Sequence, residues 1–121
     1  MTLVDTSVWI DHIRRPDARL IQLLANDLVA VHPFVIGELF CGNLKNRSAS
    51  ARYLRRLPST SITEEHEVHR LLEAHHLWGR GMSWVDLHIL ASAALNGYTV
   101  LSSDHAMNVA AIKLGIAYPV N

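Results

Sequence analysis

Four carboxylates occupy positions in this sequence from which they could meet in one site. They are Asp5 in LVDTS, Glu38 in VIGEL, Asp86 in SWVDL and Asp104 in LSSDH. Four acids brought together would repel one another strongly unless a divalent cation neutralised them. Because oxygen ligands favour Mg²⁺ or Mn²⁺ over zinc, the set predicts a site for one of these ions and metal-assisted hydrolysis as its chemistry.

Each acid also has a plainer structural explanation. Asp5 and Asp104 follow short apolar runs, and an Asp at a strand-to-helix turn is most often an N-cap. Ser83 and Asp86 have the spacing of a capping box. Glu38 is expected in the middle of a helix, on a largely apolar face, where an unpaired carboxylate is costly. For Glu38 alone, the burial argument favours a ligand over a structural role.

The elements that must position these acids are short strands alternating with helices. Apolar, β-branched runs predict strands at Thr2–Val4, Leu28–Val31, Ser61–Thr63, Thr99–Leu101 and Ile116–Tyr118. Helical patterns predict seven helices. The first five are Ser7–Ile13, Ala18–Ala25, Pro33–Gly42, Ser48–Leu57 and Glu64–Trp78, the last with Thr63 as its N-cap. The sixth follows its N-cap Ser83 and runs to Asn96, and the seventh runs from Asp104 to near Gly115. This alternation predicts an α/β fold: a single domain over residues 1–121 with a central parallel β-sheet flanked by α-helices. Asp5 and Asp104 then lie at the carboxyl edge of the sheet, where ligands gather.

Composition narrows the class of protein. The chain has 121 residues, half of them hydrophobic, and a formal net charge of zero. A single cysteine, Cys41, excludes an internal disulfide and a cysteine-based zinc site. We find no signal peptide, and no apolar run approaches the roughly 18–20 residues of a membrane span. The expectation is a cytoplasmic globular domain with no membrane association.

Basic residues are concentrated in one stretch. No acid occurs between Glu38 and Glu64, whereas five cations do: Lys45, Arg47, Arg52, Arg55 and Arg56. Such a stretch can meet phosphates, and an ordinary solvated helix face explains it equally well. Arg80, between two glycines just before the Asp86 helix, has the same two explanations.

Two other features argue against a zincin-type zinc site and against a nucleotide cofactor. His66 and His69 are spaced i and i+3, which misses the i and i+4 spacing of a zincin helix, so a polar helix face is expected. No phosphate-binding GxxxxGK[ST] or GxGxxG motif occurs, so a nucleotide cofactor is not expected.

The ordered set of motifs resembles the PIN-domain ribonucleases, specifically the VapC toxins of prokaryotic toxin–antitoxin pairs. The similarity lies in LVDTSVWID at 3–11, IGEL at 36–39, WVDLHILASA at 84–93 and LSSDHAM at 101–107. These blocks span nearly the whole chain. The last block departs slightly, because family members often have Thr-x-Asp where this chain has Ser102-Ser103-Asp104.

The resemblance implies a function and a set of roles. Asp5, Glu38, Asp86 and Asp104 would be the catalytic, metal-binding quartet for Mg²⁺ or Mn²⁺, and RNA the substrate, cut to leave 5′-phosphate and 3′-hydroxyl ends. The further residues that it implies are Thr6, Ser7 and Ser102, as hydroxyls that orient the carboxylates or a water. Arg52, Arg55, Arg56 and Arg80 are candidates for contact with RNA or antitoxin. The implied partners are a VapB-like antitoxin and a second copy of the chain in a homodimer.

Two other classes remain as alternatives. A regulatory or interaction module could keep the fold without activity, although such a protein should have lost part of the acidic set. A phosphatase of the haloacid-dehalogenase kind begins with a similar strand ending in Asp, but it needs a second acid where this chain has Ser7.

Overall fold

A three-stranded parallel sheet lies at the centre of the molecule. The structure is a computed structural model, which describes residues 1–119. Its strands are β1 (Thr2–Val4), β2 (Val29–Ala30) and β3 (Thr99–Leu101), in the order β2-β1-β3. Leu3 of β1 pairs with Ala30 on one side and with Val100 on the other. The predicted parallel sheet is therefore confirmed.

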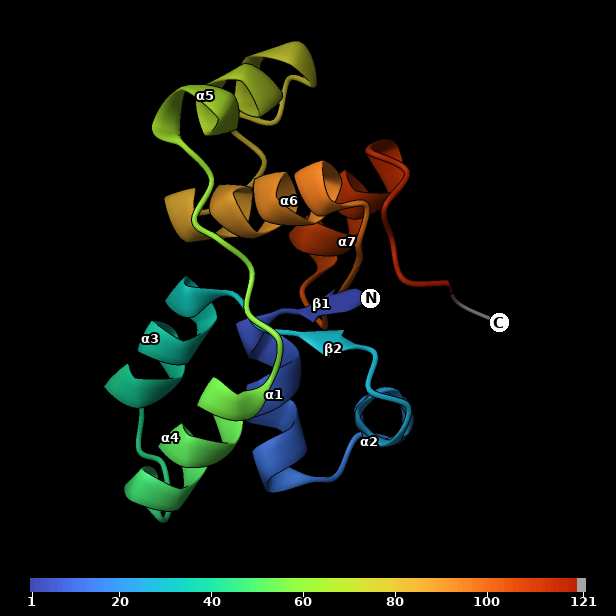
Figure 1. The fold of residues 1–121 in the computed structure, drawn as a ribbon. Helices are drawn as coiled ribbons and strands as arrows, with labels where there is room; N and C mark the ends of the chain where they lie inside the picture. The colour runs from blue at the N-terminus through green and yellow to red at the C-terminus, as the bar shows by residue number, and fades with distance from the viewer. Residues whose placement is uncertain (120–121) are drawn as a thin grey trace.

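Helices cover both sides of this sheet (Figure 1). The described part of the chain contains α1 (Thr6–Arg14), α2 (Ala18–Ala25), α3 (Pro33–Cys41), α4 (Arg47–Arg56), α5 (Glu65–Ala74), α6 (Trp84–Asn96) and α7 (His105–Lys113). Helices α6 and α7 lie on one side of the sheet, α1, α3 and α4 lie on the other, and α5 stacks on the outside of α6. The predicted α/β class with flanking helices is confirmed, and residues 120–121 of the predicted domain lie outside the described part.

The core explains why the sheet is parallel and short. Leu3 and Val4 in β1 are fully buried, as are Ile89 and Leu90 in α6, which packs on β1. A strand covered on both faces gains stability from apolar side chains at every position, so its sequence is continuously hydrophobic rather than alternating. Helix α6 supplies the cover through a buried run from residue 87 to residue 93.

The prediction of five strands was wrong for two of them. Ser61–Thr63 is not a strand, and the chain instead makes an isolated parallel bridge between Val31 and Ser59. The Ser61 carbonyl accepts a hydrogen bond from the Ser92 hydroxyl of α6, so this segment is held by a helix instead of a strand neighbour. At the other edge, Ile116–Tyr118 makes only the bridge between Val100 and Ala117.

The predicted helix over Glu64–Trp78 ends earlier than expected. Helix α5 stops at Ala74, His76 takes a positive φ of 51°, and Leu77 then turns into the core with 2% of its surface exposed. Burial of Leu77 outweighs continuation of the helix. The predicted cap was also wrong, because Thr63 is buried against Ser92 at 3.1 Å.

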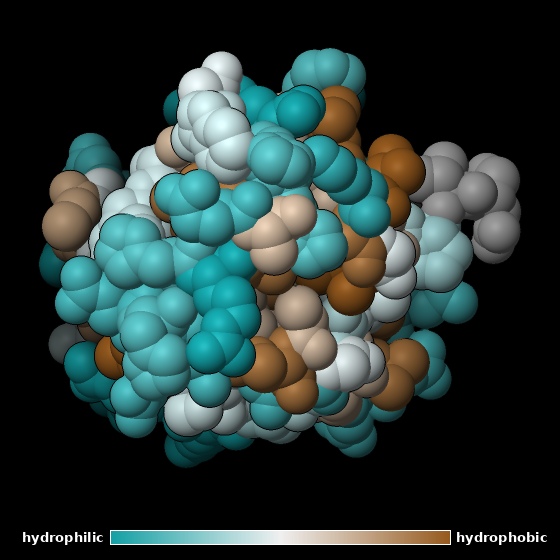
Figure 2. Space-filling model, turned by 90° about the horizontal axis from the view of Figure 1, so that it is seen from above, coloured by the Kyte–Doolittle hydropathy of each residue, from teal (hydrophilic) through white to brown (hydrophobic). Residues whose placement is uncertain are grey.

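Helix α6 is less enclosed than its composition suggests. Its last turn is exposed, and Leu95 has 62% of its surface in solvent. Figure 2 views the molecule from the side of α5 and α6, where hydrophilic residues cover much of the face and hydrophobic ones gather in patches beside them. Within residues 1–119, no helix is both long and apolar enough to cross a membrane.

Candidate active site

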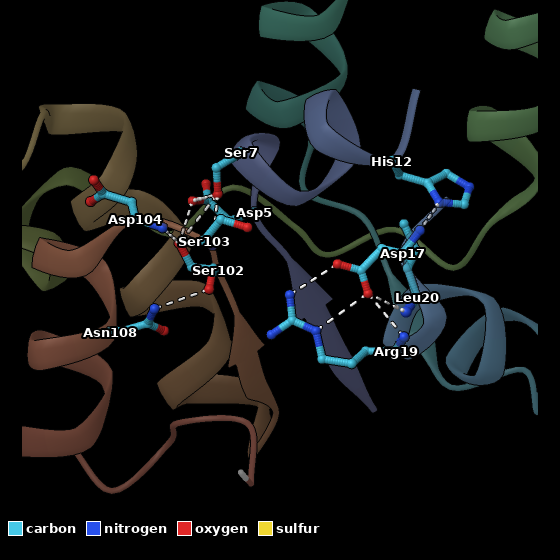
Figure 3. A network of polar contacts seen from close by, with 10 residues as sticks. All are labelled: Asp5, Ser7, His12, Asp17, Arg19, Leu20, Ser102, Ser103, Asp104 and Asn108. Atoms are coloured by element: carbon cyan, nitrogen blue, oxygen red, sulfur yellow. Dashed lines mark hydrogen bonds and ion pairs between the residues drawn. The ribbon is translucent and has the colours of Figure 1, made fainter. Parts of the chain in front are cut away.

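Asp5 lies where β1 ends and α1 begins, and its carboxylate is held by three hydrogen bonds. The Thr6 backbone N–H donates to Oδ1 at 2.8 Å, which makes Asp5 the N-cap of α1. The hydroxyls of Ser7 and Ser102 donate to Oδ2 at 2.9 and 2.8 Å. Figure 3 shows these side chains converging from α1 and from the loop after β3. Asp5 therefore has one fixed orientation.

The two serines form part of a small network around this carboxylate. Their hydroxyl oxygens are 3.3 Å apart, and Ser7 Oγ also accepts the Ser103 backbone N–H at 3.0 Å. The side-chain amide of Asn108, one turn into α7, donates to the Ser102 carbonyl at 3.0 Å (Figure 3). The sequence did not single out Asn108, although this residue lies four residues after Asp104 and therefore on the same face of α7.

Burial dominates the electrostatics of Asp5. Only 4% of the residue is exposed, and desolvation raises the pKa of its carboxyl above the ordinary value. The hydrogen bonds from Ser102 and Ser7 lower the pKa again, and the negative charge of Asp86 raises it. The charge of Asp86 therefore acts on the Asp5 carboxylate.

Asp86 forms the capping box that its spacing predicted. Its Oδ2 accepts the Ser83 backbone N–H at 2.9 Å, while Ser83 Oγ accepts the Asp86 N–H at 3.1 Å. The side chain therefore points back toward the N-terminus of α6, where the helix dipole favours a negative charge. Asp86 is half-buried.

Asp104 is the N-cap of α7. Its Oδ2 accepts the Met107 N–H at 3.1 Å, and its own N–H donates to Ser102 Oγ at 3.0 Å. The residue is exposed. A capping role and a place beside the Asp5 network thus occur together, since Ser102 contacts both acids.

Glu38 was expected in an apolar environment, and that expectation was wrong. The residue is exposed on α3, because it faces away from the buried side that carries Val35 and Leu39. It is nevertheless linked to the site, since the Thr6 hydroxyl donates to Glu38 Oε1 at 2.7 Å. Thr6 adjoins Asp5, so this bond joins α3 to the turn that holds Asp5.

Hydrogen bonds or charge link each of the other acids to Asp5 or its neighbours, but the four do not form a ready-made ligand cage. Within the described residues, no group of three or more His, Cys, Asp or Glu side chains is arranged to hold a metal ion. The ion pairs of residues 1–119 join Arg19 to Asp17, His66 to Glu64 and His69 to Glu65, so none of them neutralises the four acids. A buried carboxylate beside a second acid, with hydroxyl partners and no cationic side chain, fits a site for a hard divalent cation.

The basic candidates lie apart from the network around Asp5. The guanidinium groups of Arg47 and Arg55 lie over the Phe40 ring, at 5.8 and 5.5 Å from its centroid. Arg52 and Arg56 are exposed on the same helix, α4. Arg80 is exposed as well, and its Nε donates to the His76 carbonyl at 2.7 Å, which ties it to the turn after α5.

Comparison with known proteins places the chain in a family. The model of the PIN domain matches residues 2–113. Ribonuclease VapC32 from two strains of Mycobacterium tuberculosis, CDC 1551 / Oshkosh and H37Rv, is 42% identical over 118 residues, covering 97% of this chain and 95% of the relative. The crystal structure of PAE2754 from Pyrobaculum aerophilum has the same fold, with a TM-score of 0.58, 16% identity and 94% coverage of both chains. The chain belongs to the PIN-domain family, in its VapC-type branch.

Proposed function

We propose that this protein is a metal-dependent endoribonuclease and the toxin of a type II toxin–antitoxin pair, which inhibits growth by hydrolysing RNA. The observation that carries the proposal is the environment of Asp5. It is a buried carboxylate beside Asp86, it has two hydroxyl donors, and no basic side chain of residues 1–119 pairs with it. Its relatives of 42% identity are named as ribonucleases.

Mg²⁺ or Mn²⁺ would be held mainly by Asp5 and Asp86, with Glu38 and Asp104 completing the site. Such an ion supplies a positive charge that activates water and stabilises the negative charge developing on the phosphate. The predicted products carry 5′-phosphate and 3′-hydroxyl ends.

The hydroxyl groups of this chain have a distinct task in the proposal. Ser7 and Ser102 fix Asp5 Oδ2, and Thr6 fixes Glu38 Oε1. Carboxylates held in this way keep their free lone pairs, which for Asp5 include one on Oδ1, directed at one place, and this lowers the entropy that a bound ion or substrate must remove. Thr6, Ser7 and Ser102 are therefore positioning residues.

Helix capping involves three of the four acids: Asp5, Asp86 and Asp104. Asp86 accepts the Ser83 N–H, and Asp104 accepts the Met107 N–H. Each hydrogen bond uses one carboxylate oxygen, so the second oxygen of each acid can serve a cation without loss of the cap. The proposal thus requires no rearrangement of helices.

The partners of this site are RNA, a VapB-like antitoxin and a second copy of the chain, all in the cytoplasm. An apolar groove between α1, α3 and α4 supports the antitoxin proposal; Trp9, Ile13, Leu39 and Tyr53 are among its lining residues. Lys45 also lines this groove, and α4 carries exposed arginines. Such a groove fits an amphipathic helix with acidic flanks. Arg52, Arg55, Arg56 and Arg80 remain candidates for contact with RNA or antitoxin.

The deciding experiment is cleavage of total cellular RNA by the purified protein with Mg²⁺, with Mn²⁺ and with EDTA. Asp5→Asn is the test variant, and Asp11→Asn is the matched control, because Asp11 is an exposed acid on the same helix. Discrete fragments that require metal and Asp5, and survive Asp11→Asn, support the proposal. Products ending in 2′,3′-cyclic phosphate would contradict the mechanism.

A non-catalytic interaction module is the second candidate. It is favoured by the capping bonds of Asp5, Asp86 and Asp104 and by the lack of a preformed metal cluster in residues 1–119. Identical RNA cleavage patterns from the wild type and Asp5→Asn would support the interaction module. The phosphatase alternative has less support, because Ser7, in the place of its second acid, is a hydrogen-bond donor to Asp5.

A further inference from the structure

Trp84 is a large aromatic residue kept at the surface at the start of α6, the helix that carries Asp86. It is the first residue of α6, and 40% of it is exposed. The ring centroid of His69, on α5, lies 4.9 Å away with the planes inclined by 43°. The ring of His88, one turn further along α6, lies 5.0 Å away at 87°. Two neighbours therefore fix the orientation of the indole while part of it stays open to solvent.

The support beneath Trp84 is rigid. His88 is only 5% exposed, and Phe34 packs against its other side at 5.0 Å and 71°. Phe34 in turn contacts His32, which is fully buried, at 4.9 Å. We call His32, Phe34, His69, Trp84 and His88 the aromatic cluster. Buried contacts through His88, Phe34 and His32 hold the partly open indole of Trp84 in place, which limits the entropy lost when a ligand binds.

The aromatic cluster spans the two helices that carry half of the acidic set. Trp84 precedes Asp86 by two residues, a rise of only ~3 Å along α6. Phe34 precedes Glu38 by four residues, so both lie along one side of α3. Residues two apart on a helix point to different sides, so the indole and the Asp86 carboxylate share one end of α6 but face different sides of it.

We propose that Trp84, with His69 beside it, is a stacking subsite for one unpaired nucleobase of the RNA, a nucleotide or two from the cleaved phosphate. This inference rests on the proposed ribonuclease function. Proteins that take single-stranded RNA stack its splayed bases on aromatic side chains, and every base offers a face for this contact. The subsite would select unpaired RNA, because a base inside a duplex has no free face to offer.

The surroundings of Trp84 favour a nucleobase over a protein surface. Its exposed neighbours are polar: Ser83 is exposed, and His69 pairs at 3.5 Å with Glu65. A protein interface needs a contiguous apolar patch of several hundred Å², whereas one base needs a single ring. The exposed ring of Trp84 has the polar residues Ser83 and His69 beside it.

The test measures RNA binding in the Asp5→Asn background, where cleavage is absent under the proposed function. The variants are Trp84→Ala, Trp84→Phe and the control Trp78→Ala, which removes another exposed tryptophan that packs on a histidine, His76. The probes are a single-stranded oligoadenylate and an abasic oligonucleotide with the same number of phosphates. Steady-state cleavage of the oligoadenylate is measured in the wild-type background.

We expect Trp84→Ala to weaken oligoadenylate binding by roughly five- to a hundredfold, as for loss of one stacked base. KM should rise with little change in kcat, Trp84→Phe should retain most of the affinity, and Trp78→Ala should change neither. The abasic probe should bind the wild type and Trp84→Ala with equal affinity. If Trp84→Ala fails to fold, Trp84→Leu replaces it, because leucine keeps the apolar contact with His88 and removes the large ring.

Three results would overturn the subsite. The first is that a folded Trp84 variant keeps the KM and the RNA affinity of a wild type that cleaves RNA. The second is an equal loss of abasic binding, which would mean a phosphate contact or a disturbed fold. The third is a change in oligomeric state with RNA affinity intact, which would assign Trp84 to an interface between copies. Absence of cleavage by wild type itself would instead contradict the proposed function, so the two failures are distinguishable.

Discussion

The hydroxyl of Ser102 donates a 2.8 Å hydrogen bond to the carboxylate of Asp5, across two parallel strands that are 97 residues apart in sequence. The register of the sheet produces this contact. Val4 pairs with Leu101, so the next residue of each strand emerges at the same edge. A parallel pair thus places an acid and its hydrogen-bond donor together with no help from a loop.

Replacing Ser102 by alanine should reduce activity and shift its pH dependence. The hydrogen bond from Ser102 lowers the pKa of Asp5, so its loss raises that pKa. More of the carboxyl is then protonated at a given pH, and the acid limb of the kcat/KM profile should move to higher pH. We expect roughly a tenfold loss of kcat/KM at neutral pH.

Ser103→Ala is the matched control for this prediction. Ser103 contributes its backbone N–H to Ser7, a bond that alanine retains, and its side chain is exposed. Its pH profile should overlay that of wild type. Equal profiles for Ser102→Ala and wild type would show that the Ser102 bond does not tune the acid.

Asp5→Asn should remove activity and stabilise the fold. Burial raises the pKa of Asp5, which means that the ionised carboxylate costs folding free energy at neutral pH. Asparagine keeps an acceptor for Ser7 and Ser102 without the charge, and loss of the Thr6 N–H acceptor offsets part of the gain. We expect Tm to rise by a few degrees at pH 7.5, as for about 1 kcal/mol in a domain of this size. The gain should shrink as the pH falls and Asp5 becomes neutral.

The same variant tests metal binding without any RNA. Mg²⁺ bound only to the folded wild type should raise its Tm as the logarithm of 1 + [Mg²⁺]/Kd, and Asp5→Asn should lose this response. Asp11→Asn should keep it, since Asp11 is exposed on α1. A Tm response to Mg²⁺ that survives Asp5→Asn would place the ion elsewhere.

The sequence was sufficient to predict the position of Asp5 and Asp104, because both depend on local rules. An apolar run that ends in Asp before a helix defines both the strand end and the cap, and the structure has both features. The capping box of Asp86 follows from spacing in the same way. The roles of these acids in metal binding stay predictions.

The errors came from residues whose state depends on distant contacts. Glu38 shares α3 with many apolar residues, but which side of that helix is buried is decided by its packing on α1. Ser61 looked like a strand residue, and its carbonyl is bonded by Ser92, 31 residues away. Helix α5 ends early because Leu77 is buried in the core. None of these partners is visible in a local pattern.

Neutralising two arginines of α4 should test whether the basic stretch meets RNA. All four arginines of α4 are exposed, and the guanidinium groups of Arg47 and Arg55 also lie over the Phe40 ring, so Arg52 and Arg56 are the ones to change. If both of these cations contact phosphates, Arg52→Gln with Arg56→Gln should reduce the slope of log Kd against log salt by about 1.4 for single-stranded RNA. The measurement is a salt series of binding titrations. An unchanged slope would leave them as a solvated helix face.

His32 should make the fold sensitive to acid. The residue is fully buried, and burial, reinforced by His88, lowers its pKa from 6.5 to about 4. Its Nδ1 accepts the Phe34 N–H at 2.9 Å and so caps α3, which requires the neutral ring. In the unfolded chain the ring takes up its proton near pH 6.5, so stability is full above that pH and is lost as the pH falls toward about 4.

Urea unfolding at pH 7.5, 5.5 and 4.5 measures this loss, with His32→Asn as the comparison. Asparagine is a good N-cap that does not titrate in this range. Since each pKa unit is worth about 1.4 kcal/mol, the wild type should lose up to about 3 kcal/mol that the variant does not lose. The variant starts from a lower stability at pH 7.5, because it leaves the space of the imidazole ring beside Phe34 partly empty. The two stabilities should therefore converge on acidification, and parallel pH curves would show that His32 is not the acid-sensitive group.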